Sequence, residues 1–285
     1  MASYIKPKNL GEALRALEEP GASPIAGGTD LILLMRDGIF QPRVLVDISQ
    51  LEELQGIREN GEFLEIGAAT KLKEIAESES IPYCLKKGAK LVGSSQIRNL
   101  GTIGGNICNA SPSGDTLPPL IVLEGQLVLE SSSGKREVPV ESFFTGPKKT
   151  VRNAKELLTK IRIPKKNLAK NTAFAKIGGR NGMIIAQVNG AISCLLNNSR
   201  LSEVRLAFGS VAPIPIRTKK AENLLEEESL SEFPARVLSA IQEEIRPISD
   251  QRGSAEYRRA LIKAIFFELL SELGTAQGRF SNEKD

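Results

Sequence analysis

The hydrophobic positions near the start of the chain alternate between helical and strand spacing. Between residues 10 and 17 the apolar side chains recur every three or four positions behind Asn9, a candidate N-cap, and Pro20-Gly21 ends the run. The next expected elements are a short strand at 24–26, a glycine turn at 27–30, an apolar helix at 31–35 and a β-rich run at 44–48. Strand, turn, helix and strand in this order predict a βαβ unit with a small parallel sheet.

After residue 51 the pattern becomes that of antiparallel hairpins. The runs 55–58 and 63–66 flank Asn60-Gly61, a dipeptide suited to a tight type I′ turn because both residues tolerate positive φ. The further elements expected here are helices at 71–77 and 83–92, a glycine-rich stretch at 101–106, a hairpin that pairs 127–129 with 137–140, and a closing strand at 156–163. This part of the chain predicts a second, antiparallel lobe.

The stretch Lys165–Lys170 is predicted to be a linker into a second domain. The elements expected beyond it are strands at 172–177, 184–196 and 201–208, a helix that begins near Pro234-Ala235, a last helix that opens at Gly253-Ser254, and a frayed tail from 274 to 285. We therefore expect an α+β fold with one domain over residues 1–170, divided into lobes of about 1–53 and 54–170. A second domain over 171–285 would carry a small antiparallel sheet and helices.

Composition indicates an ordinary soluble protein. Of the 285 residues, 41% are hydrophobic and 25% are charged, which allows a substantial core. The first ten residues lack the apolar core of a secretory signal, and no stretch approaches the roughly 18 uninterrupted apolar residues that a membrane span needs. Cys84, Cys108 and Cys194 are widely separated, which does not suggest a disulfide framework and fits a reducing compartment. We expect a cytoplasmic protein.

The absence of histidine excludes several kinds of chemistry. Ser-His-Asp and Cys-His nucleophilic machinery cannot be built, so a hydrolase is not expected. Three scattered cysteines without histidine do not supply a four-ligand zinc or iron–sulfur site, so metal chemistry would belong to a partner. The formal net charge of +4 is modest and most charges are interspersed, which argues against a nucleic-acid binder.

One segment departs from this balance of charge. From Lys148 to Lys170 the only acid is Glu156. The basic residues of this run are Lys148, Lys149, Arg152, Lys155, Lys160, Arg162, Lys165, Lys166 and Lys170. A solvated face is the simpler interpretation, and contact with an acidic partner subunit or a phosphorylated cosubstrate is the alternative.

Two glycine turns carry the strongest chemical signal, Ala26-Gly27-Gly28-Thr29-Asp30 and Thr102-Ile103-Gly104-Gly105-Asn106. Because adjacent glycines lack Cβ, the backbone can approach a ligand closely and direct successive N–H groups into one concavity that suits a diphosphate. The first turn also precedes a predicted helix, whose N-terminus favours an anion. Either glycine pair alone is commonly a plain tight turn, but the two together predict a shared anion site.

Two better-known phosphate motifs are absent from the sequence. A P-loop requires Gly-Lys followed by Ser or Thr, whereas Gly134-Lys135 precedes Arg136 inside a predicted hairpin. A Rossmann fingerprint requires Gly-x-Gly-x-x-Gly after the first strand, and Gly178–Gly182 has the wrong spacing. A nucleotide bound here would therefore use another kind of phosphate loop.

The segments AGGTDL and TIGGN resemble the two diphosphate loops of the FAD-binding domain in molybdenum hydroxylases, the family of xanthine, carbon monoxide and nicotinate dehydrogenases. Three later segments are similar to successive parts of the family's C-terminal flavoprotein domain: FAKIGGRNGMIIAQVNGAI at 174–192, GSVAPIPIR at 209–217 and DQRGSAEYRR at 250–259. The matches keep the family's order and cover nearly the whole chain.

The resemblance implies a fold and a function. The fold is a two-lobed FAD-binding domain of the p-cresol methylhydroxylase and vanillyl-alcohol oxidase type, followed by the C-terminal domain. The function is that of an oxidoreductase subunit whose FAD passes electrons from [2Fe–2S] clusters of a small iron–sulfur subunit to NAD+ or another acceptor. A large molybdopterin-binding subunit would oxidise the substrate, so this chain needs no catalytic acid, base or nucleophile. Hydroxybenzoyl-CoA reductase fits less well, because its flavin subunit carries a cysteine-ligated cluster for which this chain lacks cysteines.

The resemblance also implies cofactor contacts, carried over by position. These are Pro24, Ile25, Ala26, Gly27, Gly28, Thr29, Asp30, Leu31, Thr102, Ile103, Gly104, Gly105, Asn106, Asp115, Leu157 and Lys176. Asp115 would accept hydrogen bonds from sugar or ribityl hydroxyls, with a turn-capping role as the alternative. Lys176 would close over the cofactor from the next domain, or else be an exposed strand residue. Arg98 would add charge near the diphosphate or lie on the surface.

Five further residues belong to the C-terminal motifs, and we interpret them as structural or interface residues rather than redox groups: Arg180, Arg217, Arg252, Tyr257 and Arg258. Two other functions stay open on the sequence alone. One is a self-contained flavin oxidase or reductase on the same fold, and the other is a structural subunit with a vestigial flavin site.

Overall fold

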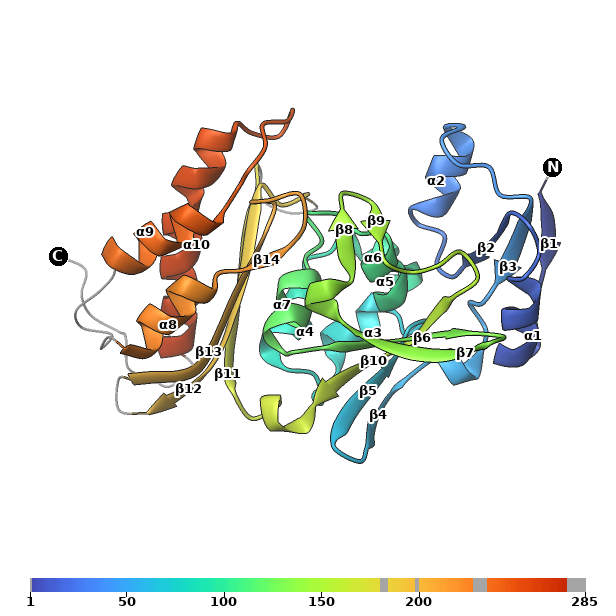
Figure 1. Ribbon diagram of the computed structural model, residues 1–285, viewed down its shortest axis with the longest axis horizontal. Helices are drawn as coiled ribbons and strands as arrows, with labels where there is room; N and C mark the ends of the chain where they lie inside the picture. The colour runs from blue at the N-terminus through green and yellow to red at the C-terminus, as the bar shows by residue number, and fades with distance from the viewer. Residues whose placement is uncertain (1, 180–183, 198–199, 228–234, 276–285) are drawn as a thin grey trace.

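Three groups of elements lie side by side along the molecule in the computed structural model, which describes residues 2–179, 184–197, 200–227 and 235–275 (Figure 1). The N-terminal group forms one end, an antiparallel sheet with helices forms the middle, and the C-terminal sheet with its helices forms the other end. This arrangement agrees with the α+β fold expected from the sequence. None of the described helices is both long enough and apolar enough to cross a membrane.

The N-terminal group is a three-stranded parallel sheet in the order β1-β3-β2. Its elements are β1 (Ser3–Ile5), α1 (Leu10–Ala16), β2 (Ala22–Ile25), α2 (Leu31–Arg36) and β3 (Val44–Asp47). Helix α1 begins as predicted, because Asn9 Oδ1 accepts a hydrogen bond from the N–H of Glu12 at 2.9 Å. The βαβ unit is confirmed. Strand β1 escaped the prediction because its three residues are mostly exposed and show no apolar pattern.

The middle group is a five-stranded antiparallel sheet in the order β4-β5-β10-β6-β7, with helices packed against it. The strands are β4 (Ile57–Asn60), β5 (Phe63–Gly67), β6 (Gln126–Ser131), β7 (Gly134–Pro139) and β10 (Leu157–Pro164), with β8 (Phe144–Gly146) and β9 (Lys149–Thr150) as a separate pair. The helices are α3 (Leu72–Glu77), α4 (Tyr83–Lys90), α5 (Ser95–Leu100), α6 (Ile103–Cys108) and α7 (Leu117–Val122). The predicted closing strand is thus β10, the central strand of the sheet.

Local details of this lobe differ from the prediction. Asn60 pairs with Phe63, so the turn residues are Gly61 and Glu62, and of the predicted pair only Gly61 has positive φ, at +55°. The prediction of a type I′ turn at Asn60-Gly61 is therefore wrong. The glycine-rich stretch at 101–106 enters helix α6, with Thr102 as its N-cap. Helix α7 was missed because two prolines occupy its first turn, where a missing N–H is tolerated.

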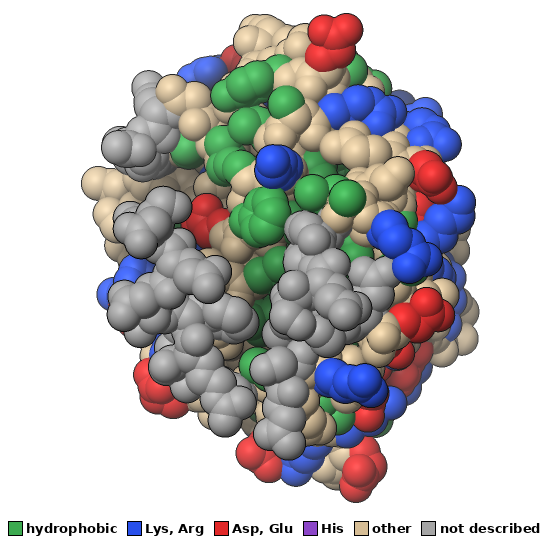
Figure 2. Space-filling model, turned by 90° about the vertical axis from the view of Figure 1, so that its left-hand side faces the viewer, with side chains coloured by type: hydrophobic (Ala, Val, Ile, Leu, Met, Phe, Trp, Pro, Cys, Tyr) green, Lys and Arg blue, Asp and Glu red, His purple; other side chains and the backbone are tan. Residues whose placement is uncertain are grey.

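The C-terminal group is a four-stranded sheet in the order β11-β12-β13-β14, covered on one face by helices. Its elements are β11 (Asn171–Ile177), β12 (Val188–Asn197), β13 (Arg200–Gly209), β14 (Ile216–Arg217), α8 (Lys219–Glu227), α9 (Ala235–Glu244) and α10 (Ala255–Thr275). On the outer side that faces the viewer in Figure 2, apolar side chains gather in a band with charged residues toward the rim. Arg180, Pro234 and residues 276–285 lie outside the described residues, whereas residues 274–275 end α10.

Alternation along the strands buries both faces of this sheet. Phe174, Ala191 and Ala207 belong to the apolar core of the middle lobe, whereas Ala173 and Ile192 pack with the C-terminal helices. Both sets of side chains are fully buried. The sheet is therefore a shared wall, and it holds the middle lobe and the C-terminal helices in one packed unit.

Most of the basic run pairs with acids from distant parts of the chain. The ion pairs join Lys155 to Glu18, Lys160 and Arg162 to Glu65, Lys165 to Glu59, Lys166 to Glu124, and Lys170 to Glu203. Of the same run, Lys148, Lys149 and Arg152 form no ion pair within the described ranges. The segment thus links strands and lobes and is not one continuous cationic face.

Replacement of Glu65 by glutamine tests this network. The Glu65 carboxylate accepts from Arg162 Nε at 2.8 Å and Lys160 Nζ at 3.0 Å. Although burial opposes ionisation, these hydrogen bonds lower the pKa of Glu65 to about 2. We expect Glu65→Gln to reduce the free energy of unfolding by about 1–3 kcal/mol at neutral pH.

Urea denaturation across pH measures the effect. Because a lowered pKa stabilises the fold above about 4.5 and this contribution is lost as pH falls through 2, the two proteins should converge in acid. The matched control is Glu59→Gln, since the exposed Lys165–Glu59 pair should contribute less than about 0.5 kcal/mol. Equal losses in both variants would contradict the assignment.

Candidate functional site

A cavity of about 490 Å³ lies between the N-terminal lobe and the middle lobe. The N-terminal lobe contributes Ser23–Leu31, Leu34, Ile39, Phe40 and Ile48 to its lining. The middle lobe contributes Ala68, Leu72, Val92, Ile97, Gly101, Thr102, Gly104–Asn106, Cys108, Asn109, Lys148, Arg152, Leu157 and Leu158. Segments that are more than a hundred residues apart in the sequence thus meet around one space.

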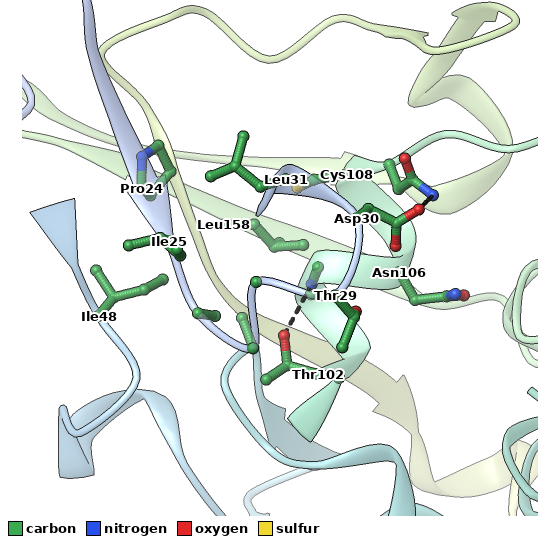
Figure 3. A pocket seen from close by; sticks show the side chains of 18 of the residues that line it. Pro24, Ile25, Thr29, Asp30, Leu31, Ile48, Thr102, Asn106, Cys108 and Leu158 are labelled. Atoms are coloured by element: carbon green, nitrogen blue, oxygen red, sulfur yellow. Dashed lines mark hydrogen bonds between the residues drawn. The ribbon is translucent and has the colours of Figure 1, made fainter. Parts of the chain in front are cut away.

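The lining has an apolar side and a polar side. Pro24, Ile25 and Ile48 lie together at one side in Figure 3, and Asp30 and Asn106 lie at the other. Thr29 and Thr102 lie between these two groups. Such a surface suits an amphipathic ligand that carries flat apolar rings at some distance from charged or hydroxylated groups.

Close packing brings the two glycine turns together. A Cβ atom on Gly27 would lie 2.0 Å from the carbonyl oxygen of Leu100 and 3.0 Å from Cα of Gly101, so no side chain fits there. Asn109 Nδ2 also donates a hydrogen bond to Asp30 Oδ1 at 2.9 Å, which ties the end of helix α6 to the first turn. The first turn is therefore docked directly on the residues that precede the second.

The backbone amides of the two turns differ in their availability. Within the described chain, the N–H groups from Gly27 to Asp30 donate no hydrogen bond, and Gly28 has φ of +69°. The amides of residues 103–106 all donate within the protein, to oxygens of Thr70, Ala68 and Thr102. The first turn thus offers a continuous run of free amides to an anion, whereas in the second turn only the N–H of Thr102 has no acceptor among the described residues. This differs from the expectation that both turns offer successive amides.

Packing within the protein requires Gly104 of the second turn. A Cβ atom on Gly104 would lie 2.7 Å from both Cβ and the carbonyl oxygen of Ala68, and the N–H of Gly104 donates to that oxygen at 2.8 Å. Gly104 therefore lets helix α6 start directly against Ala68, the residue that follows β5. Close backbone approach thus explains this glycine, as expected, but the neighbour that approaches is protein.

Most of the predicted contact residues line the cavity. The lining includes every residue of Pro24–Leu31, and also Leu157. It includes Thr102–Asn106 except for Ile103, which is fully buried in the core. Asp115 and Lys176 lie outside this lining. Their contact with a cofactor stays a prediction.

Asp115 and Lys176 form a buried ion pair between the middle lobe and the C-terminal sheet. Their side chains are 7% and 4% exposed, and Lys176 Nζ also donates to the carbonyl of Leu91 at 3.0 Å. Asn189 Nδ2 donates to Asp115 Oδ1 at 2.9 Å. Burial raises the pKa of Asp115 to about 6, although Lys176 and Asn189 oppose this shift. The pair therefore fixes how two parts of the chain meet.

Arg98, Arg217, Arg252 and Arg258 lie outside the cavity lining. Arg98 donates to the carbonyls of Val92 and Gly93 and so fastens the chain before α5. Arg217 forms a bidentate pair with Glu222, and Arg258 is buried against backbone carbonyls. These contacts support the structural interpretation of Arg217 and Arg258.

Sequence reasoning missed several lining residues. The apolar ones are Leu34, Ile39, Phe40, Ile48, Ala68, Leu72, Val92, Ile97 and Leu158. They carry no motif, because an apolar residue that lines a cavity has the same pattern as one that fills a core. Lys148 and Arg152 were visible only as part of the basic run, and their place at the cavity depends on how the β8–β9 turn folds back.

Known proteins resemble the whole chain. The family described as FAD binding domain in molybdopterin dehydrogenase matches residues 1–166, and that described as CO dehydrogenase flavoprotein C-terminal domain matches residues 173–273. The xanthine dehydrogenase FAD-binding subunit of Escherichia coli O157:H7 is 35% identical over 286 residues, with 97% of each chain covered. The carbon monoxide dehydrogenase medium chain of Hydrogenophaga pseudoflava is 33% identical over 264 residues, with 90% of this chain and 92% of that one covered.

Solved structures agree with the sequence comparison. A carbon monoxide dehydrogenase from Hydrogenophaga pseudoflava that lacks the Mo-pyranopterin moiety matches with a TM-score of 0.89 and 31% identity, over 96% of this chain and 97% of that one. A quinoline 2-oxidoreductase from Pseudomonas putida 86 matches with a TM-score of 0.90 and 26% identity, over 97% and 98%.

Gly27→Ala tests the contact between the turns. Since the methyl group would overlap the backbone of Leu100, one turn must move, and we expect flavin affinity to fall at least about tenfold. The matched control is Gly11→Ala in α1, where the nearest atom is 3.4 Å away and alanine favours the helix by up to about 1 kcal/mol. Unchanged affinity in Gly27→Ala, measured by fluorescence titration, would contradict the packing described.

Asp115→Asn tests the buried pair through its pH dependence. A folded pKa of about 6, raised above the ordinary value of 3.8, means that the stabilising contribution is complete below about pH 4 and is lost as pH rises through 6. We expect the unfolding free energy of the wild type, minus that of the variant, to fall by about 2–3 kcal/mol over this range. Denaturant melts at several pH values measure it, and parallel profiles would count against a buried Asp115.

Proposed function

Since the chain belongs to the molybdenum hydroxylase family of FAD-binding subunits, we propose that it holds FAD between an iron–sulfur subunit and an electron acceptor. Electrons would arrive singly from [2Fe–2S] clusters of a small partner subunit and leave in pairs to NAD+ or another acceptor. A large molybdopterin-binding subunit would oxidise the organic substrate. The complex would be cytoplasmic, which suits three free cysteines.

The observation that carries this proposal is the free amide run at Gly27–Asp30, set in a cavity with an apolar side. A diphosphate needs several donors that no protein acceptor has already taken, and these amides meet that need. The apolar side suits flat aromatic rings, and Thr29, Asn106 and Asn109 offer polar groups for hydroxyls or ring edges. The residues present therefore fit FAD.

Bound FAD supplies the ability to exchange one or two electrons, and the protein supplies position and electrostatics. Pro24, Ile25, Leu157 and Leu158 would exclude water from one side of the site by covering it with apolar surface. The amides at Gly27–Asp30 would hold the diphosphate. None of these roles needs a side chain that gains or loses a proton, which is consistent with a chain without histidine.

The C-terminal region favours a subunit over a self-contained flavin enzyme. It matches the flavoprotein C-terminal domain of carbon monoxide dehydrogenase over residues 173–273, and the two curated relatives above are named as subunit and chain. A self-contained oxidase or reductase would oxidise an organic substrate alone. A vestigial site would not be expected to keep both glycine turns and a run of free amides.

The proposal predicts that the purified chain binds FAD in a ratio of about one to one and does not oxidise organic substrates alone. Gly28→Val and Gly104→Val should abolish binding, because Gly28 has positive φ and Gly104 packs on the Ala68 backbone. Absorbance in the flavin bands after gel filtration measures loading. Yellow, fully loaded variants, or turnover of an organic substrate by the isolated chain, would contradict the proposal.

A further inference from the structure

We propose that Lys148 supplies a cationic charge at the cofactor site, where its ammonium offsets the negative charge of the diphosphate held at Gly27–Asp30. This inference rests on the proposed function and adds a residue to it. Lys148 lines the cavity from the turn between β8 and β9, outside both glycine turns. The experiment below distinguishes a variant that has lost the charge of Lys148 from one that has failed to fold.

The backbone fixes Lys148 in an uncommon conformation. Its φ is +60°, a region that residues with a Cβ rarely adopt, and its N–H donates to the carbonyl of Ala110 at 2.9 Å. Ala110 itself has φ of +47° and lies just after the end of helix α6. Strained residues persist where the surroundings determine them, so the β8–β9 turn is held against α6 at one defined place.

The side chain of Lys148 is hydrogen-bonded toward the first glycine turn. Lys148 Nζ donates to Asn109 Oδ1 at 2.6 Å, and Asn109 Nδ2 donates to Asp30 Oδ1 at 2.9 Å. Three elements that surround the cavity are thus joined by one chain of hydrogen bonds. This chain ends on Asp30, the last residue of the turn whose amides are free.

The negative charge of Asp30 in the cavity lining explains why a bound diphosphate needs a nearby cation. Asp30 places a carboxylate beside the free amides, and this charge would repel a diphosphate unless a cation offsets it. Arg152 also lines the cavity and keeps its positive charge, but its Nη1 donates to the carbonyls of Asn153 and Glu156, whereas the Lys148 ammonium donates to Asn109, which is bonded to Asp30. Among the described residues, Lys148 has no carboxylate within ion-pair distance, so its charge is available to a ligand.

Groups from several elements shift the pKa of Lys148. Partial desolvation lowers the pKa of Lys148, the nearby Asp30 carboxylate opposes this shift, and the Arg252 guanidinium from the C-terminal region adds to it. Lys148 is nevertheless exposed. A second negative charge from a bound diphosphate would favour the charged form, which is the arrangement expected of a ligand-binding lysine.

The experiment compares four variants of the full chain: Lys148→Met, Lys148→Gly, Lys148→Arg and Lys149→Met. Lys148→Gly removes the charge and also relieves the positive φ, so it cannot fail through backbone strain. Lys149→Met removes the neighbouring charge at the start of β9, and Lys149 does not line the cavity. Thermal unfolding establishes that each variant is folded, and fluorescence titration gives the dissociation constant for FAD at several salt concentrations.

We expect Lys148→Met and Lys148→Gly to weaken FAD binding about 10-fold to 100-fold and to flatten its salt dependence, because one charge pair is lost. Lys148→Arg should stay within about threefold of the wild type, and Lys149→Met should match it. Unchanged affinity in the two neutral variants, or weaker binding with the wild-type salt dependence, would overturn the inference. A wild type that binds no FAD would instead refute the proposed function itself.

Discussion

The close approach of Gly27 to the backbone of Leu100 is the contact on which the site depends. It joins a parallel α/β lobe to an antiparallel lobe at a point where no side chain fits, and the Asn109–Asp30 hydrogen bond reinforces it. The first turn is thereby held open toward the cavity with its amides unused. Without this contact the free amides of the first turn would no longer be held in place against the second lobe.

Packing on the other side of the middle lobe has a different physical basis. The C-terminal sheet contributes apolar side chains to two cores at once, and the buried Asp115–Lys176 pair fixes its position against helices α4 and α7. A buried ion pair is a costly way to join two parts of a chain, since burial disfavours both charges. Its value here is geometric, because Asp115 of the middle lobe accepts from both Lys176 and Asn189 of the C-terminal sheet, which defines how the two parts meet.

The sequence predicted the order of the lobes and most of the long elements, because these depend on local periodicity and turn residues. It also predicted the two glycine segments, since adjacent glycines are visible without a structure. It could not assign different roles to them, because free amides at Gly27–Asp30 and satisfied amides at 103–106 follow from long-range contacts with Ala68 and Thr70. For the same reason the sequence showed Lys148 only as one member of the basic run, since folding brings its turn against α6.

A structure of the chain with FAD bound tests the central claim most directly. The account predicts that oxygens of the diphosphate lie at hydrogen-bond distance, about 3 Å, from the backbone nitrogens between Gly27 and Asp30. The cofactor would then lie in the cavity between the lobes, with a ring system on the side of Pro24 and Ile25. A diphosphate that leaves these amides without an acceptor, or a cofactor bound elsewhere, would contradict it.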